Sequence, residues 1–300
     1  TQGAIKVSVG RYSGATTQVV GTKSCAVMSD KSVRCWSIPE GISLSDASIM
    51  PYLSSTGIPT TLDGFDNIID IALSNYDDNL CALRTDGQIQ CSGSNDVGQL
   101  GDGTIIASEA PVIVVGISNA VALSYNGKTG CATLENGNAK CWGLNTTTNF
   151  MGIGASQFTS LPVEIHSSGG LIGAIALSSS SDIVCAATLT GQLQCWGESE
   201  KYTADWFSKV NEAKNIVKVK SNEQFGWCFE RSIGAIQCAT PLRYKGSGSI
   251  DYGAFGLGRG TYYNSPTAVS ISNLNNIKQV EVTSLQPADT STACALDYNG

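Results

Sequence analysis

The sequence is poor in histidine and in charged residues. Its 300 residues include one histidine, His166, and charged side chains make up 14% of the chain. Zinc sites and acid–base catalysis draw heavily on histidine, and the chain has no Gly-x-Ser-x-Gly motif or paired nucleophile and base. We therefore predict no catalytic residues, no metal ligands and no cofactor, so the chain is expected not to be an enzyme.

Clusters of basic residues and long apolar runs are also absent. The net charge is −7, and no group of Lys or Arg could follow a phosphate backbone. No run approaches the roughly 18 apolar residues of a membrane span, and the N-terminus lacks a basic segment followed by an apolar one. We expect no nucleic-acid partner and no membrane insertion within this segment, and interpret the sequence as a mature chain or one that begins after a signal peptide.

Cysteine, by contrast, is abundant and regularly spaced. Ten of the eleven cysteines form five pairs whose members lie ten positions apart, and Cys294 stands alone. The pairs are Cys25 and Cys35, Cys81 and Cys91, Cys131 and Cys141, Cys185 and Cys195, and Cys228 and Cys238. This abundance is typical of oxidising compartments, so we predict an extracellular or cell-surface location. Zinc is the rival use of cysteine, but it would require closer ligand spacing.

Each cysteine pair belongs to a repeated unit. The units begin 43 to 66 residues apart, a spacing typical of propeller blades and solenoid arrays. The sixth residue after the first cysteine is glycine in five of six units and lysine in the first: Gly87, Gly137, Gly191, Gly234, Gly300 and Lys31. A three-residue hairpin loop needs a left-handed residue at this position, where glycine is least strained. We therefore predict a β-hairpin closed by its own disulfide in each complete unit.

Further strands are predicted on both sides of each hairpin. Apolar stretches precede five of them, at residues 68–73, 120–123, 172–177, 216–219 and 277–282. A fourth strand is expected at Pro111 to Val115, Pro162 to Ile165 and Pro266 to Ile271, since proline tolerates an edge position. Four antiparallel strands make a propeller blade. The predicted fold is all-β: a single β-propeller domain over residues 1–300, with four-stranded antiparallel blades and one disulfide per hairpin.

Residues 91–104 read CSGSNDVGQLGDGT, and weaker copies lie at 141–154, 195–197 and 253–261. This pattern resembles the repeat of the regulator of chromosome condensation family, in which Trp-Gly-x-Asn is followed by Gly-Gln-Leu-Gly-x-Gly. The resemblance implies a seven-bladed propeller, of which about six hairpins are visible here. It also implies that the chain continues past Gly300, where the partner of Cys294 would lie about ten residues on.

The chain also departs from that pattern. Ser92 and Ala239 replace the expected tryptophan, and residues 241–243 read Pro-Leu-Arg where Gly-x-Asn is expected. No segment matches the part of the nuclear exchange factor that contacts its GTPase. Disulfide-containing members resemble secreted or surface proteins, and a secreted bacterial β-lactamase-inhibitor protein (β-lactamase-inhibitor protein II) shares the architecture.

Several motifs have both a structural and a functional interpretation. The glycines of residues 98–103 resemble a phosphate-binding loop, but no helical pattern follows them, so a structural role is favoured. The tryptophans after the second cysteine, Trp36, Trp142 and Trp196, are expected to pack between blades or over the disulfide. Asp96 and Asp102 fit no compact calcium-loop spacing. Asn145 begins the chain's Asn-x-Thr sequon, a possible N-glycosylation site in a predicted loop.

The candidate interaction sites are three long insertions, because propeller loops vary on a rigid frame. These cover residues 37–61, 198–215 and 244–263. Exposed aromatic residues are frequent at protein interfaces, and packing against a neighbouring blade is the equal alternative for Trp206 and Phe207. The aromatic candidates are Tyr202, Trp206, Phe207, Tyr244, Tyr252, Phe255, Tyr262 and Tyr263.

Together these patterns predict a non-enzymatic extracellular module for protein interaction or structure, as in a surface adhesin or a larger extracellular assembly or fibre. A protein partner or self-assembly is expected. One alternative is a secreted inhibitor that covers an enzyme's active site with one face of loops. Another is a lectin-like, glycan-binding propeller, which would need carboxylates beside exposed aromatic rings in one pocket.

Overall fold

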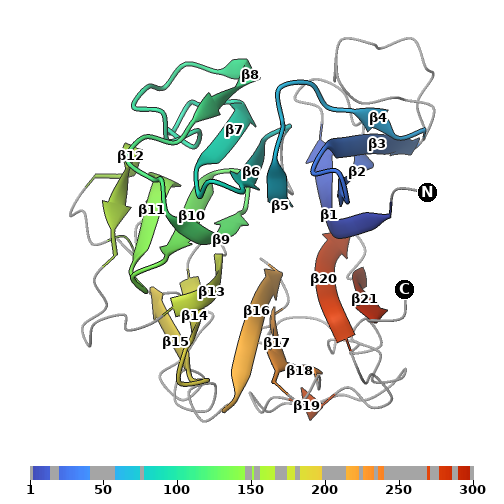
Figure 1. Cartoon of the computed structure of the whole chain (residues 1–300), viewed down its shortest axis with the longest axis vertical. Coiled ribbons are helices and arrows are strands. Elements are labelled where there is room, and N and C mark those ends of the chain that lie inside the picture. Colours follow the sequence, from blue (N-terminus) through green and yellow to red (C-terminus); the bar gives the residue numbers. More distant parts are fainter. Residues whose placement is uncertain are drawn as a thin grey trace, which may run out of the picture. The chain divides into compact units, whose positions relative to one another are not determined.

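The computed structural model describes residues 3–13, 20–40, 58–74, 78–145, 151, 156–165, 174–179, 183–197, 214–222, 226–232, 236–239, 269–270, 277–285 and 290–297. These residues form strands joined by turns and loops, with no helix among them (Figure 1). Accordingly, no helix within these ranges could cross a bilayer. The predicted all-β class is confirmed.

The strands form six antiparallel sheets, each made of consecutive strands, which we call blades 1 to 6. Blade 1 contains β1 (Ala4–Ser13), β2 (Val20–Met28), β3 (Val33–Glu40) and β4 (Thr60–Thr61); blade 2 contains β5 (Ile68–Leu73), β6 (Leu80–Arg84), β7 (Ile89–Gly93) and β8 (Ser108–Ile113); blade 3 contains β9 (Ala120–Tyr125), β10 (Thr129–Leu134), β11 (Ala139–Leu144) and β12 (Phe158–Glu164). Blade 4 contains β13 (Ala174–Ser179), β14 (Ile183–Thr188) and β15 (Leu193–Gly197); blade 5 contains β16 (Ile216–Asn222), β17 (Gly226–Arg231), β18 (Ile236–Ala239) and β19 (Val269–Ser270); blade 6 contains β20 (Ile277–Leu285) and β21 (Thr290–Asp297).

The chain divides into two compact units. The first comprises Thr1–Glu135, Ala139–Asn145 and Ile153–Ile165, and so contains blades 1 to 3 apart from one turn. The second comprises Asn136–Asn138, Thr146–Gly152 and His166–Gly300. The single domain expected from the sequence stays a prediction.

The predicted strands are present. All five apolar stretches coincide with the first strands of blades 2 to 6, and β5 has the predicted bounds. The proline-containing segments form or overlap the fourth strands β8, β12 and β19. Pro111 and Pro162 lie on the outermost strands of their sheets, where the missing N–H costs no ladder hydrogen bond.

The ten-residue cysteine spacing corresponds to a bridge across one hairpin. Disulfides join Cys25 to Cys35, Cys81 to Cys91, Cys131 to Cys141 and Cys185 to Cys195, with Cα atoms 4.0 to 4.1 Å apart. In blade 5, Cys228 is disulfide-bonded and lies directly opposite Cys238 in the strand register. The predicted disulfide is therefore confirmed in each hairpin of blades 1 to 4. Cys294 lies in β21, and its pairing stays a prediction.

The hairpin turns also link one blade to the next. The sixth residue after the first cysteine is left-handed in each described turn: φ is 66° at Lys31, 76° at Gly87, 81° at Gly137 and 73° at Gly191. Its carbonyl oxygen accepts a hydrogen bond from the first strand of the following blade. The donors are the backbone N–H groups of Ile68, Ala120 and Ile216, at 2.9 to 3.0 Å; Gly137 O accepts from Ala174 N at 3.1 Å within the second unit.

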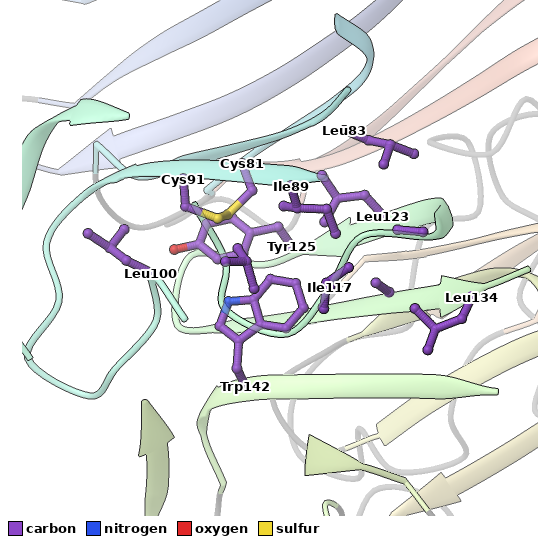
Figure 2. Packing of buried hydrophobic residues seen from close by; sticks show 13 residues of the cluster. Cys81, Leu83, Ile89, Cys91, Leu100, Ile117, Leu123, Tyr125, Leu134 and Trp142 are labelled. Carbon is purple, nitrogen blue, oxygen red and sulfur yellow. A yellow bond between two sulfur atoms is a disulfide. The ribbon is translucent and has the colours of Figure 1, made fainter. Parts of the chain in front are cut away.

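The disulfides lie in the apolar packing between blades, which we call junctions. Junction 1–2 contains Cys25 and Cys35 together with Phe65 and Ile68, and both cysteines are buried. Junction 2–3 contains Cys81 and Cys91 beside the rings of Tyr125 and Trp142 (Figure 2). In the second unit, Cys185 packs with Ile216 and Phe229 across junction 4–5. Each of these bridges is thus part of the core that holds two blades together.

Candidate interaction surface

The loop of residues 94–107, between β7 and β8, folds around one buried amide. Asn95 is 1% exposed. Its Nδ2 donates to Asp102 Oδ1 at 3.2 Å and to the carbonyl oxygens of Thr104 at 3.2 Å and Ile106 at 3.1 Å. Its Oδ1 accepts the backbone N–H of Leu100 at 2.9 Å. One side chain therefore fixes both arms of this loop, and we call residues 94–107 the latch loop.

The carboxylates of the latch loop bind groups of the protein itself. Gln99 is buried; its Oε1 accepts from Val97 N at 2.9 Å and its Nε2 donates to Asp96 Oδ1 at 2.8 Å. The pKa of Asp96 is lowered by this hydrogen bond and by the Lys128 ammonium, 3.8 Å away. Asp102 Oδ1 accepts from the backbone N–H and the hydroxyl of Thr104. No group of potential metal ligands occurs among the described residues.

The latch loop of blade 2 packs onto blade 3. Leu100 is fully buried beside the Trp142 ring in junction 2–3 (Figure 2). Trp142 Nε1 donates to the carbonyl oxygen of Gln99 at 3.0 Å, and Gly103 N donates to Ser160 O at 3.0 Å. A Cβ at Gly101, whose φ is +67°, would lie 2.8 Å from Trp142 Cδ1. The predicted role of Trp142 in packing between blades is confirmed.

The glycines of this loop do not form a phosphate cradle. The backbone N–H groups of Gly98, Gly101 and Gly103 donate to Asn95 O, Gly98 O and Ser160 O. The loop leads into strand β8, so no helix dipole faces it. These glycines have the structural role that the sequence predicts.

Exposed apolar side chains gather around the latch loop. Eleven large apolar side chains are exposed within the described ranges, and six lie on the latch loop, on β8 and the residue two positions beyond it, or on β12. Ile106 is 72% exposed and Ile105 is 57% exposed. The six, which we call the latch surface, are Ile105, Ile106, Ile113, Val115, Phe158 and Leu161.

Contacts across the blades connect this surface. Val115 N donates to Gly101 O at 2.9 Å, so the end of blade 2 lies against the latch loop. A Cβ at Gly103 would lie 3.4 Å from Leu161 Cδ2. The latch surface therefore extends from blade 2 to β12 of blade 3, and backbone hydrogen bonds join the segments that carry it.

The outermost strands of blades 2 and 3, β8 and β12, have features that disfavour pairing with a further strand. Three hydroxyl groups donate to carbonyl oxygens two residues on: Ser108 Oγ to Ala110 O, Ser156 Oγ to Phe158 O, and Thr159 Oγ1 to Leu161 O, at 2.7 to 2.8 Å. Pro111 and Pro162 offer no N–H. Native sheets use such features to resist edge-to-edge pairing.

The segments that carry the latch surface are acidic. Residues 94–116 and 156–165 contain four carboxylates and no Lys or Arg: Asp96, Asp102, Glu109 and Glu164. Of the cations near these segments, Lys128 pairs with Asp96, and Lys140, which faces Glu164 in the strand register, donates to Gly116 O at 3.0 Å. The rim of the apolar surface thus has an excess of negative charge.

Asn145 is placed as a second loop anchor. Like Asn95, it is the fourth residue after the second cysteine of its unit and is 1% exposed. Its Nδ2 donates to Ser156 O at 2.8 Å. A glycan on Nδ2 would remove a donor and need space where the amide is buried, so this geometry does not support the sequon as a glycosylation site. The sequence signal for this anchoring role is that both asparagines lie four positions after the second cysteine of their unit.

The structure does not test the aromatic candidates that the sequence singles out. Tyr202, Trp206, Phe207, Tyr244, Tyr252, Phe255, Tyr262 and Tyr263 fall outside the described residues, as do His166 and Gly234. The latch surface was missed from the sequence. Its signal is the pair Ile105 and Ile106, two adjacent aliphatic residues within a loop of turn-forming residues.

No family model matches the sequence, and no curated protein matches it. Among solved structures, the chain is similar to human WBSCR16, with TM-score 0.66 and 13% identity over 92% of this chain and 69% of that one. It is similar to Prp20p from Saccharomyces cerevisiae, with TM-score 0.59 and 15% identity over 86% of this chain and 64% of that one. It is also similar to yeast RCC1 (Prp20) bound by Kap60, with TM-score 0.61 and 15% identity over 92% of this chain and 65% of that one.

These similarities show the fold. The chain has the RCC1-like β-propeller fold, with four-stranded antiparallel blades and a disulfide in each hairpin whose cysteine side chains the structure describes. It spans just under two thirds of the length of the yeast protein.

Proposed function

We propose that this chain is a non-enzymatic, extracellular or cell-surface protein-interaction module. The observation that carries the proposal is the buried disulfide that recurs at the junctions of an RCC1-like propeller. Cytosolic thiols are kept reduced, so a core that contains a disulfide at successive junctions suits an oxidising compartment.

The binding role is supported by the fold and by the latch surface. Prp20p binds Gsp1p and histones, and yeast RCC1 is bound by Kap60. Here the blades hold exposed apolar side chains on a loop whose backbone is fixed by buried hydrogen bonds. Preorganised apolar residues favour binding because little conformational freedom is lost on association.

The location is tested by thiol labelling of the native source. Cells or secretions are treated with an alkylating reagent under denaturing conditions, then reduced and treated with a second, heavier reagent. Mass spectrometry should find the heavier label on Cys81, Cys91, Cys131 and Cys141. The first label on these cysteines would show reduced thiols and would overturn the extracellular assignment.

The binding role is tested by cross-linking the chain in the same source. A protein partner identified by cross-linked peptides, which a competing excess of the purified chain removes, is the expected outcome. Binding to a glycan array without a protein partner would favour the lectin-like alternative. Inhibition of a partner enzyme would favour the inhibitor. Turnover of a small molecule would refute the non-enzymatic assignment.

A further inference from the structure

We infer that the latch surface binds a basic segment of a partner protein that also carries apolar side chains. This inference rests on the proposed function and assigns to it a location and a partner chemistry. Its basis is the combination of exposed isoleucines, a fixed loop backbone and a rim of carboxylates.

The isoleucines are held outward by the loop itself. The carbonyl oxygens of Thr104 and Ile106, on either side of Ile105, both accept from the buried Nδ2 of Asn95. Ile105 and Ile106 therefore cannot turn inward without breaking hydrogen bonds to a buried amide. Large exposed apolar side chains on neighbouring segments, rimmed by polar residues, are a feature of interaction sites in soluble proteins.

The partner must bring positive charge. The two segments that form the surface contain four carboxylates and no Lys or Arg. Asp96 pairs with Lys128 and Glu164 faces Lys140 in the strand register, so the charge that a partner would complement is that of Asp102 and Glu109. Glu109 is exposed at its rim. A segment with Lys or Arg beside apolar residues would cover the isoleucines and complement these charges, which raises both specificity and the rate of association.

A second copy of the chain is a poor occupant. A symmetric contact would bring the acidic segments of two copies together, and the whole chain carries a charge of −7. Addition of a strand at this edge is also disfavoured, since hydroxyl groups bond three of its carbonyl oxygens and two prolines lack N–H groups. The partner is therefore expected to bind through its side chains.

The test uses the oxidised chain and a fluorescently labelled synthetic peptide of alternating Leu and Lys blocks. A matched peptide with Glu in place of Lys is the control probe. The variant is Ile106→Asp, and Leu189→Asp is the control variant, because Leu189 is 77% exposed in blade 4. Thermal unfolding of both variants establishes that they fold.

The expected result is saturable binding of the Lys peptide that weakens as salt is added. Ile106→Asp should weaken binding about tenfold or more, which corresponds to about 1.4 kcal/mol, whereas Leu189→Asp should change it less than about twofold. Amide exchange should slow at residues 103–106 and 158–161 when the peptide binds.

Several outcomes would overturn the inference. Equal binding to both variants would indicate non-specific charge attraction, and equal binding of the Glu peptide would remove the charge argument. Self-association in sedimentation that Ile106→Asp abolishes would make the surface a contact between copies. If cross-linking finds a partner at a different surface, this assignment is wrong while the interaction function stands. If cross-linking finds no partner at any surface, the proposed interaction function is wrong, and the inference that rests on it is wrong as well.

Discussion

Junctions 1–2 and 2–3 are built on the same backbone plan and completed by different side chains. In both, a buried disulfide of the earlier blade lies in the apolar core, and a left-handed turn residue accepts a hydrogen bond from the later blade. The turn residue is Lys31 in the first junction and Gly87 in the second. Within the described ranges, contacts from Trp142 and the latch loop are seen at the second junction. The recurring hydrogen bond joins the blades, and at junction 2–3 the latch loop adds its own contacts.

The largest expected effect comes from removing the tryptophan that binds the latch loop at junction 2–3. Trp142→Ala should destabilise the protein by about 3 to 5 kcal/mol, because it leaves a cavity under the latch loop and removes the donor to Gln99 O. Trp36, which follows the second cysteine of blade 1, is only half-buried. Trp36→Ala should cost clearly less in denaturant unfolding, and equal losses would contradict the distinction between these two sites.

Removing the disulfide should affect both junctions alike. The variants Cys25→Ala/Cys35→Ala and Cys81→Ala/Cys91→Ala each open an eleven-residue loop, which costs about 2.8 kcal/mol on the chain-entropy estimate. Denaturation midpoints under non-reducing conditions measure both losses. A clear difference between the two variants would mean that junction packing, and not loop closure, dominates their effect.

Exchanging the turn residues should give effects of opposite sign. Gly87→Ala should cost about 1 to 3 kcal/mol, since its φ is positive and the new Cβ would lie 2.7 Å from Ser118 O. Lys31→Gly relieves left-handed strain of about 1 to 2 kcal/mol but adds about 0.5 to 1 kcal/mol of chain entropy. A gain of at most about 1.5 kcal/mol is therefore expected. Destabilisation by Lys31→Gly would show that the lysine side chain itself supports junction 1–2.

The smallest expected effect is a loss of stability at acidic pH. The pKa of Asp86 is lowered by hydrogen bonds from Arg84 and from the backbone N–H of Gln88. Its folded pKa therefore lies below its unfolded value of about 3.9. The stability it contributes is present above about pH 4 and is lost as pH falls through the folded pKa. Its side chain is half exposed, so the contribution is small.

The test is the difference in Tm between the wild type and Asp86→Asn, measured from pH 7 down to about pH 2.5. The difference should shrink as the carboxylate is protonated. A constant difference would show that the Asp86 charge does not stabilise the turn.

Local sequence determined the parts of the fold that depend on neighbouring residues. The spacing of Cys81 and Cys91 and the position of Gly87 were enough to predict a disulfide hairpin, because strand register and turn conformation are set within eleven residues. The residue type of Lys31 does not indicate a left-handed conformation, and only its alignment with the turn glycines of the other units does so. Its carbonyl oxygen accepts a hydrogen bond from Ile68 of the next blade, as Gly87 does from Ala120.

The features that the sequence concealed depend on contacts outside the cysteine hairpins. Asn95 resembled a loop residue, and its burial depends on the opposite arm of the latch loop. Each blade also has a register shift in its first strand, at Ile69 in blade 2 and Val121 in blade 3. No turn residue marks these bulges. The apolar pattern therefore located the strands without showing that these two side chains are exposed.

The closeness in sequence of the two cysteines in each bridge has a consequence for biosynthesis. Eight cysteines can be joined in about 105 ways, yet each of the four bridges here connects a cysteine to its nearest pairing partner along the chain. Oxidation of a hairpin can thus follow its emergence during synthesis, before the following blade exists. When that blade then packs on, Cys81 and Cys91 are shielded from attacking thiolates. Translation order thereby protects each correct pairing from later exchange.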